Sequence, residues 1–354
     1  MSRFIDERLS NLEAYVPGEQ PKPGEFIKLN TNEFPYPPAN SVKKAAADAT
    51  MNMNLYSDLT CKELTDSFSK VFGYGNKNVV FTNGSDEALY LSFLTFCGKN
   101  RGVAYPDITY GFYSVYAELC GIEPTVIPLD NDLSVVPNDY FGLNKTIVIA
   151  NPNAPTGKML SIDEIEEIVK SNSDNVVVID EAYADFSGQT CVKLIEKYDN
   201  LVVIGTFSKS RGMAGARLGY LIACEELVND IQRVKFSINP YNVNSLTQAV
   251  GKAVLDNNDY YADRVKEICE TRDSFSNSLI ALGFEVIPSN TNFVFAKHIS
   301  INGKEIASKL RERGILIRRF DKARISEYLR ISVGTPEQMK TVISALKDII
   351  GGYQ

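Results

Sequence analysis

A lysine and several donors suited to a phosphate lie close together in the segment from Leu201 to Gly219, LVVIGTFSKSRGMAGARLG. The apolar run Leu201–Ile204 predicts a buried strand, and Lys209 follows the end of that strand. Desolvation there would lower the pKa of the lysine amine from roughly 10.4 and make the amine a nucleophile toward carbonyl carbon. The donors around it are Thr206, Ser208 and Arg217. An amine that attacks an aldehyde beside a phosphate site indicates pyridoxal phosphate (PLP) as the cofactor.

A further anion site is predicted in TNGSDEALYLSFL, where a strand gives way to a helix. Gly84 and Ser85 end the strand and its loop, and Asp86 begins an apolar-periodic helix. Free backbone N–H groups and the positive end of the helix dipole favour an anion at such a start. Taken alone, Ser85 reads equally well as a helix N-cap. Beside Lys209 and its donors, these residues favour the cofactor phosphate.

A buried carboxylate and two aromatic side chains follow other predicted strands. Asp180 ends the run Val176–Ile179, so its carboxylate must be paired or hydrogen-bonded, and a protonated pyridine nitrogen would supply the partner. Tyr183 comes three residues later. Tyr110 follows another strand and can stack on a ring, although several neighbours are equally placed on sequence alone. Those competing aromatic residues are Tyr105, Phe112, Tyr113 and Tyr116.

Five blocks of the chain resemble fold-type I, PLP-dependent aminotransferases, in the order and spacing of that family. They include LNTNE near the N-terminus, NPNAPTG at 151–157, TFSK at 206–209, RLGY from Arg217, and LRISVGTP near the C-terminus. Within that group the chain most resembles the histidinol-phosphate aminotransferases. The family usually shows N-E-N-P-Y-G-P where this chain has NEFPYPP, so Phe34 and Pro37 are departures that put a side-chain role for this loop in doubt.

The resemblance implies roles for residues that sequence pattern alone does not select. Asn153 and Tyr183 would contact the phenolate oxygen of PLP, and Tyr110 would stack on its ring. Tyr56 would reach across a homodimer interface to the cofactor phosphate of the partner subunit. Five residues would bind the substrate: Tyr15 and Arg318 at its phosphate end, Arg330 at its amino-acid-like end, and Tyr56 and Asn153 in addition to their contacts with the cofactor.

The activity that the resemblance implies is amino-group transfer, with Lys209 holding the cofactor and moving the proton. The expected substrates are L-histidinol phosphate and the glutamate/2-oxoglutarate pair. Similar paralogues accept aromatic amino acids or act on threonine phosphate, so these alternatives stay open. A catalytically silent regulator is a further alternative, but such proteins generally lack the lysine or carry an added DNA-binding segment.

The elements that must position these residues form an α/β pattern. Seven apolar runs, mostly separated by helix-length stretches, predict a largely parallel seven-stranded sheet between layers of helices. Ligands bind such sheets outside the carboxyl ends of the strands, where the candidate residues from Gly84 onward fall. We expect an N-terminal arm over residues 1–40, a large PLP-binding domain over 41–240, and a small α+β domain over 241–354. Asn239–Pro240 is the expected hinge.

Composition narrows the class of protein further. The 354 residues carry 37 Lys and Arg against 44 Asp and Glu, a net charge of −7 without a basic run, so nucleic acid is not an expected partner. The N-terminus lacks the apolar core of a signal peptide, and no apolar run is long enough for a membrane span. The six cysteines lack a C-x-x-C pair and predict a cytoplasmic protein with reduced thiols. His298 is the only histidine, and no metal is expected.

Overall fold

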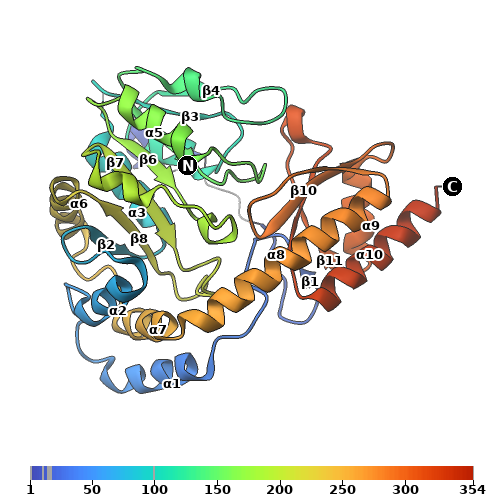
Figure 1. Ribbon diagram of the computed structural model, residues 1–354, viewed down its shortest axis with the longest axis horizontal. Helices are drawn as coiled ribbons and strands as arrows, with labels where there is room; N and C mark the ends of the chain where they lie inside the picture. Colours follow the sequence, from blue (N-terminus) through green and yellow to red (C-terminus); the bar gives the residue numbers. More distant parts are fainter. Residues whose placement is uncertain (1, 10–11, 14–17, 99, 354) are drawn as a thin grey trace.

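The main sheet has the expected seven strands, and they lie in the order β2-β8-β7-β6-β5-β3-β4 (Figure 1). The computed structural model describes residues 2–9, 12–13, 18–98 and 100–353. Strand β8 runs antiparallel to both neighbours, and the other pairs are parallel. The strands are β2 Val79–Thr82, β3 Val103–Pro106, β4 Pro124–Ile127, β5 Thr146–Ala150, β6 Val177–Asp180, β7 Leu201–Thr206 and β8 Gly219–Ala223.

Both faces of this sheet are covered by helices. Successive residues of β6 illustrate this: Val177 and Ile179 belong to one apolar cluster, and Val178 belongs to another on the opposite face. A strand buried on both faces must be apolar throughout, which explains the continuous runs in the sequence. The helices of this unit are α1 Asn40–Ala49, α2 Lys62–Phe72, α3 Ser85–Phe96, α4 Phe112–Leu119, α5 Ile162–Ser171, α6 Glu225–Ile238 and α7 Ser245–Asp256. Helix α1 packs on α7.

A smaller unit lies beside the large one and is reached through the long helix α8, Asn258–Ala281 (Figure 1). Its antiparallel sheet has the order β12-β13-β10-β9, and β1 pairs in parallel with β11. Helix α10 begins after Thr335, which forms a capping box with Gln338. The remaining bounds are β1 Ile27–Lys28, β9 Phe284–Ile287, β10 Phe293–His298, α9 Gly303–Glu312, β11 Ile315–Leu316, β12 Arg318–Arg319, β13 Leu329–Ser332 and α10 Pro336–Gly351.

The two apolar cores meet within α8, later in the chain than the expected boundary near Asn239–Pro240. Helix α7 follows that break but folds back onto α1 and α2, and Val254 and Leu255 belong to the core of the large unit. Ile268 and Phe275 of α8 belong to the core of the small unit. The break therefore separates two helices of one unit. The described part of the arm packs on the small unit through β1.

Two further findings concern ligands and membranes. Among the described residues, no helix is both long and apolar enough to cross a bilayer. Within the same residues, no group of three or more His, Cys, Asp or Glu side chains is placed to hold a metal ion.

Candidate active site

A cavity at the carboxyl ends of β5, β6 and β7 brings most of the predicted cofactor residues together. These strand ends meet at one edge of the sheet because the three strands are parallel. The residues that line the cavity are Ser85, Asp86, Tyr110, Ala150, Pro152, Ala154, Asp180, Ala182, Tyr183, Thr206, Ser208, Lys209 and Arg217. Segments more than 100 residues apart in the chain thus contribute to one site.

Lys209 lies in this cavity, three residues beyond the end of the fully buried strand β7. Its Nζ donates a hydrogen bond to the backbone carbonyl of Thr31 at 3.3 Å and lies 5.8 Å from the ring centroid of Tyr183. The arm that carries Thr31 therefore reaches the reactive amine. The side chain is partly buried, which suits an amine that must accept an aldehyde from the cavity.

Asp180 sits at the base of the same cavity, with its side chain almost fully buried. Oδ2 accepts a hydrogen bond from the Tyr113 hydroxyl at 2.8 Å, and Oδ1 accepts one from the Ala182 N–H at 3.1 Å. Burial raises the pKa of Asp180 from 3.8 to about 6, and the bond from Tyr113 opposes that rise. A cationic ring nitrogen in the cavity would find a pre-formed carboxylate partner here.

Tyr113 is a site residue that sequence reasoning missed. The sequence offered it only as a competitor of Tyr110 for stacking, whereas its ring is fully buried and its hydroxyl holds Asp180. Burial, and then the charge of Asp180, raise the pKa of Tyr113 well above its usual value, so it stays a donor. Nothing in YPDITYGFY distinguishes a stacking ring from one that hydrogen-bonds a carboxylate, so only the fold reveals this role.

The opposite end of the cavity is shaped to hold an anion. Gly84 has φ +81° and precedes α3, whose start carries no side-chain cap, so its first N–H groups are open to a ligand. A Cβ on Gly84 would lie 2.3 Å from Nη2 of Arg217, so only glycine lets the guanidinium approach. The Ser208 hydroxyl is buried and, among the described residues, makes no hydrogen bond. A buried hydroxyl of this kind needs a partner, and a bound phosphate would supply it.

Asp86 and Thr206 are hydrogen-bonded to other residues of the protein in this structure. The Asp86 carboxylate pairs with Nη2 of Arg217 at 2.9 Å and accepts a hydrogen bond from the Tyr110 hydroxyl at 2.7 Å. It thereby fixes the guanidinium and the ring that line the cavity. The Thr206 hydroxyl accepts the N–H of Ser208 at 3.1 Å. The predicted contacts of Asp86 and Thr206 with the phosphate stay predictions.

Asn153 is buried beside the cavity without lining it. Its amide group donates to the carbonyl of Ile108 at 2.9 Å and to the Thr156 hydroxyl at 3.1 Å. These bonds hold the loop whose Pro152 and Ala154 do line the cavity. Contact between Asn153 and a phenolate oxygen, which the resemblance implies, would require one of these hydrogens to change partner. That contact stays a prediction.

The two predicted substrate arginines face each other in the small sheet. Arg318 on β12 pairs in register with Arg330 on β13, and their guanidinium carbons lie 5.6 Å and 5.4 Å from the ring centroid of Phe320. Nη2 of Arg330 also donates to the carbonyl of Asn30 in the arm at 3.1 Å. Like charges opposite each other on paired strands repel, and an anion between them would relieve the repulsion. Neither arginine lines the cavity around Lys209.

The two predicted tyrosines stand apart from this arrangement. Tyr56 is 83% exposed, and its ring stacks on Tyr241 with the centroids 4.5 Å apart. Its contact with a partner subunit therefore stays a prediction. Tyr15 lies outside the described residues.

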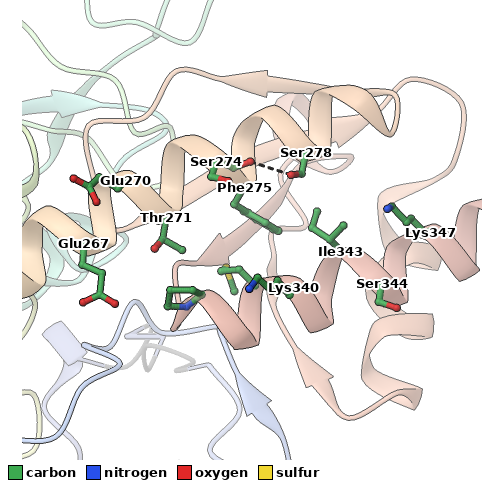
Figure 2. A pocket seen from close by; sticks show the side chains of 12 residues that line it. Glu267, Glu270, Thr271, Ser274, Phe275, Ser278, Lys340, Ile343, Ser344 and Lys347 are labelled. Carbon is green, nitrogen blue, oxygen red and sulfur yellow. Dashed lines mark hydrogen bonds between the residues drawn. The ribbon is translucent and has the colours of Figure 1, made fainter.

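A wider groove lies elsewhere, between α8 and α10 of the small unit (Figure 2). Its volume is about 550 Å³, against about 100 Å³ for the cavity around Lys209. Phe275 and Ile343 form part of its floor, and Glu267, Glu270, Lys340 and Lys347 lie along it (Figure 2). It has no strand end and no buried carboxylate of the kind found at Asp180, so chemistry, not volume, selects the smaller cavity.

Comparison with known proteins agrees with this fold. The model of the family described as aminotransferase class I and II matches residues 24–346. The chain is 46% identical over 343 residues to the histidinol-phosphate aminotransferase of Lactococcus lactis subsp. cremoris (strain SK11), covering 97% of this chain and 96% of that protein. It is 42% identical over 355 residues to the enzyme of that name from Clostridium beijerinckii, covering 100% and 99%.

A solved structure agrees in overall fold. The histidinol-phosphate aminotransferase of Sinorhizobium meliloti, in complex with pyridoxal-5'-phosphate, superimposes with a TM-score of 0.86 at 21% identity, covering all of both chains. The fold and the lysine-centred cavity define an α/β enzyme of the aminotransferase type. The chain belongs to the class I and II aminotransferase family.

Proposed function

We propose that this protein is a PLP-dependent aminotransferase of histidine biosynthesis, which moves the amino group of glutamate to imidazole acetol phosphate and forms L-histidinol phosphate and 2-oxoglutarate. The observation that carries the chemistry is Lys209 in one cavity with the buried carboxylate of Asp180 and the unsatisfied Ser208 hydroxyl. The substrate assignment is supported by the two curated relatives over their full length.

Each residue of the cavity has a task that follows from its position. Bound PLP supplies an aldehyde for the amino group and a ring that withdraws electrons from the reacting carbon. Ser208, Arg217 and the start of α3 would hold its phosphate. Asp180 would pair with the ring nitrogen, and Tyr113 keeps that carboxylate oriented. The Lys209 amine would move the proton between the reacting carbon of the substrate and the aldehyde-derived carbon of the cofactor.

The substrate's phosphate must supply most of its orienting charge, because L-histidinol phosphate has no α-carboxylate. Arg318 and Arg330 offer two guanidinium groups on adjacent strands, and Phe320 holds both. Guanidinium groups bind phosphate and carboxylate through paired hydrogen bonds. Arg318 can therefore serve the phosphate of histidinol phosphate, and Arg330 can serve the amino-acid-like end of the substrate.

A homodimer with composite sites is also part of the proposal. Large apolar side chains are exposed in two segments that the stacked rings of Tyr56 and Tyr241 bring together. Those side chains are Met51, Met53, Leu55, Tyr56, Phe236, Ile238 and Tyr241. Exposed apolar side chains gathered in this way are typical of a protein–protein interface.

The six free cysteines support the expected cytoplasmic location.

The test is a comparison of kcat/KM for L-histidinol phosphate and phenylalanine, each with 2-oxoglutarate, in the wild type and in Arg318→Ala. A charge-assisted contact contributes roughly 1.5–3 kcal/mol, so the variant should lose about ten- to a hundredfold on histidinol phosphate. The slow activity on phenylalanine should be spared, because its ring needs no cation.

Two control variants make the result specific. Lys209→Ala should lose transfer from both substrates, and Arg313→Ala, at an exposed arginine that directly follows α9, should change neither. If Arg318→Ala loses both substrates equally, the phosphate role is wrong, and an aromatic or generalist aminotransferase becomes the better assignment. Full activity in Lys209→Ala would refute the proposed chemistry altogether.

A further inference from the structure

Asn32, in the LNTNE segment of the arm, is almost completely buried and has the left-handed backbone angle φ +56°. Its backbone N–H donates to the Ser332 hydroxyl at 2.9 Å, and its carbonyl accepts from Nδ2 of Asn292 at 3.0 Å. Its side chain accepts from the Ser332 hydroxyl at 3.0 Å and donates to the Tyr183 hydroxyl at 2.9 Å. Backbone and side chain are therefore held together in one orientation.

The partners of Asn32 come from three parts of the chain that meet at the active site. Tyr183 follows β6 of the large unit and lines the cavity. Ser332 ends β13, and Asn292 precedes β10 in the small sheet. The carbonyl of the adjacent residue, Thr31, accepts the hydrogen bond from Nζ of Lys209. Asn32 thus lies where the arm, the small unit and the reactive lysine come together.

The orientation of the Asn32 amide follows from counting protons. The oxygen of the Ser332 hydroxyl already accepts the Asn32 N–H, so the hydroxyl proton is available for Oδ1 of Asn32. This places the NH₂ group of Asn32 toward Tyr183. The Tyr183 hydroxyl is then an acceptor from Asn32, and its own proton must point elsewhere.

That proton has no acceptor within the part of the chain that the structure describes, because the bond from Asn32 is the only one to this hydroxyl. Tyr183 lines the cavity, so the open direction is toward a ligand. A hydroxyl that accepts one hydrogen bond becomes a stronger donor of another, since the two bonds polarise each other. The hydroxyl is therefore prepared to donate to an oxygen of the cofactor.

We propose that Asn32 is a positioning residue that directs the Tyr183 hydroxyl proton toward the ring oxygen of the cofactor, and that Ser332 holds Asn32 in the orientation that does so. This inference rests on the proposed function. It also joins the cofactor to the substrate side of the site, because Arg330 lies two residues before Ser332 on β13 and so shares its face of the sheet. Arg330 and Ser332 hold Asn30 and Asn32 of the arm, respectively.

The test is a pH titration of the visible absorbance of the PLP-loaded protein without substrate. A hydrogen bond donated to the ring oxygen stabilises its negative charge and favours loss of the proton shared with the lysine nitrogen. Asn32→Ala weakens that bond and should raise the pKa of the chromophore by roughly 0.5–1 pH unit. Ser332→Ala should shift it in the same direction by less. Asn32→Asp removes the donor at constant size and should shift it at least as far as Asn32→Ala.

The matched control is Asn30→Ala. Asn30 is an equally buried asparagine of the same arm, but its amide donates to the carbonyl of Glu19 and not to Tyr183. It should lower stability without moving the chromophore pKa. The dissociation constant for PLP, measured by dialysis of the apoprotein, is a second readout: Asn32→Ala should raise it about two- to tenfold, and Asn30→Ala should not.

Two results separate the possible failures. If Asn32→Ala lowers the melting temperature but leaves the chromophore pKa and the PLP dissociation constant at wild-type values, Asn32 is purely structural and the inference is wrong. If Asn32→Ala does not fold, Ser332→Ala and Asn32→Asp decide the matter by the same criterion. If wild-type protein mixed with PLP shows no visible absorbance band from a cofactor bound to Lys209, the proposed function itself is contradicted.

Discussion

At the scale of single residues, the site combines groups whose charge depends on burial. Asp180 is held by Tyr113 and by a backbone N–H, yet burial still raises its pKa to about 6 in the protein without its cofactor. The adjacent Glu181 behaves similarly: burial raises its pKa to about 7 although it accepts bonds from Thr190 and Cys191. The apoprotein therefore carries two carboxylates, Asp180 and the partly exposed Glu181, that are costly to ionise.

This cost predicts a pH dependence for the stability of the apoprotein. The folded pKa of Asp180 lies above its unfolded value, so its contribution is fully present below pH 3.8 and is lost as the pH rises through about 6. The free energy of unfolding of the wild type, relative to Asp180→Asn, should fall by up to about 3 kcal/mol between pH 4 and pH 7. Urea unfolding of both apoproteins across that range measures it. A difference that stays constant with pH would refute the expected burial cost.

At the scale of elements, the site depends on the close approach of β8 to the start of α3. Gly219 begins β8 between Thr82 of β2 and Thr206 of β7. A Cβ on Gly219 would lie 2.4 Å from the backbone of Gly84 and of Ser85, and backbone atoms cannot move aside cheaply. The absence of a side chain at Gly219 therefore sets the position of the predicted phosphate-binding turn.

Gly219→Ala should displace that turn. We expect a loss of roughly 1–3 kcal/mol in the free energy of unfolding, as for other overpacked sites, together with weaker PLP binding. The matched control is Gly215→Ala in the loop between β7 and β8, where a Cβ would meet no atom within 4 Å. Thermal melts with and without PLP measure both effects. Equal behaviour of the two variants would show that the close approach does not position the turn.

At the scale of the whole molecule, the arm and α8 connect two cores that the active site needs together. Strand β1 of the arm pairs with β11 of the small unit, and Thr31, three residues beyond β1, meets Lys209. The small unit therefore approaches the cofactor residues through the arm. The exposed apolar side chains around Tyr56 are the surface through which we propose that a second copy of the chain binds.

Mixing two inactive variants tests the composite dimer. If Tyr56 serves the partner's site, a dimer of one Lys209→Ala subunit and one Tyr56→Ala subunit contains one wild-type site. Random exchange should then restore about a quarter of wild-type activity. Lys209→Ala mixed with Asp180→Asn should restore none, because both residues belong to the same chain's site. Failure of the first mixture, or full activity in a diluted monomer, would contradict the composite site.

Much of this architecture was predictable because it depends on local patterns. The seven apolar runs became the seven strands, since residues buried on both faces of a sheet must be apolar. Ser161 and Thr335 cap the helices that follow them, and a Glu or Gln three residues further on closes a capping box at each. Asp180 ends β6, and Lys209 lies three residues beyond the end of β7. Both positions could be predicted because an apolar run in the sequence stops where a buried strand ends.

The partners of those residues were decided only by the tertiary structure. Tyr113 and Asp180 are 67 positions apart, and Asn32 lies 151 positions from Tyr183 and 300 from Ser332. No local periodicity encodes which donor meets which acceptor over such distances. The boundary between the two cores, inside α8, was also decided by the tertiary structure. Helix α7 belongs to the large unit because it packs on α1 and α2, although it follows the break at Asn239–Pro240. The sequence alone determined the strands and the reactive groups, because burial and helix starts are local properties. The folded chain alone determined how those groups are oriented, because a hydrogen bond needs both partners in place.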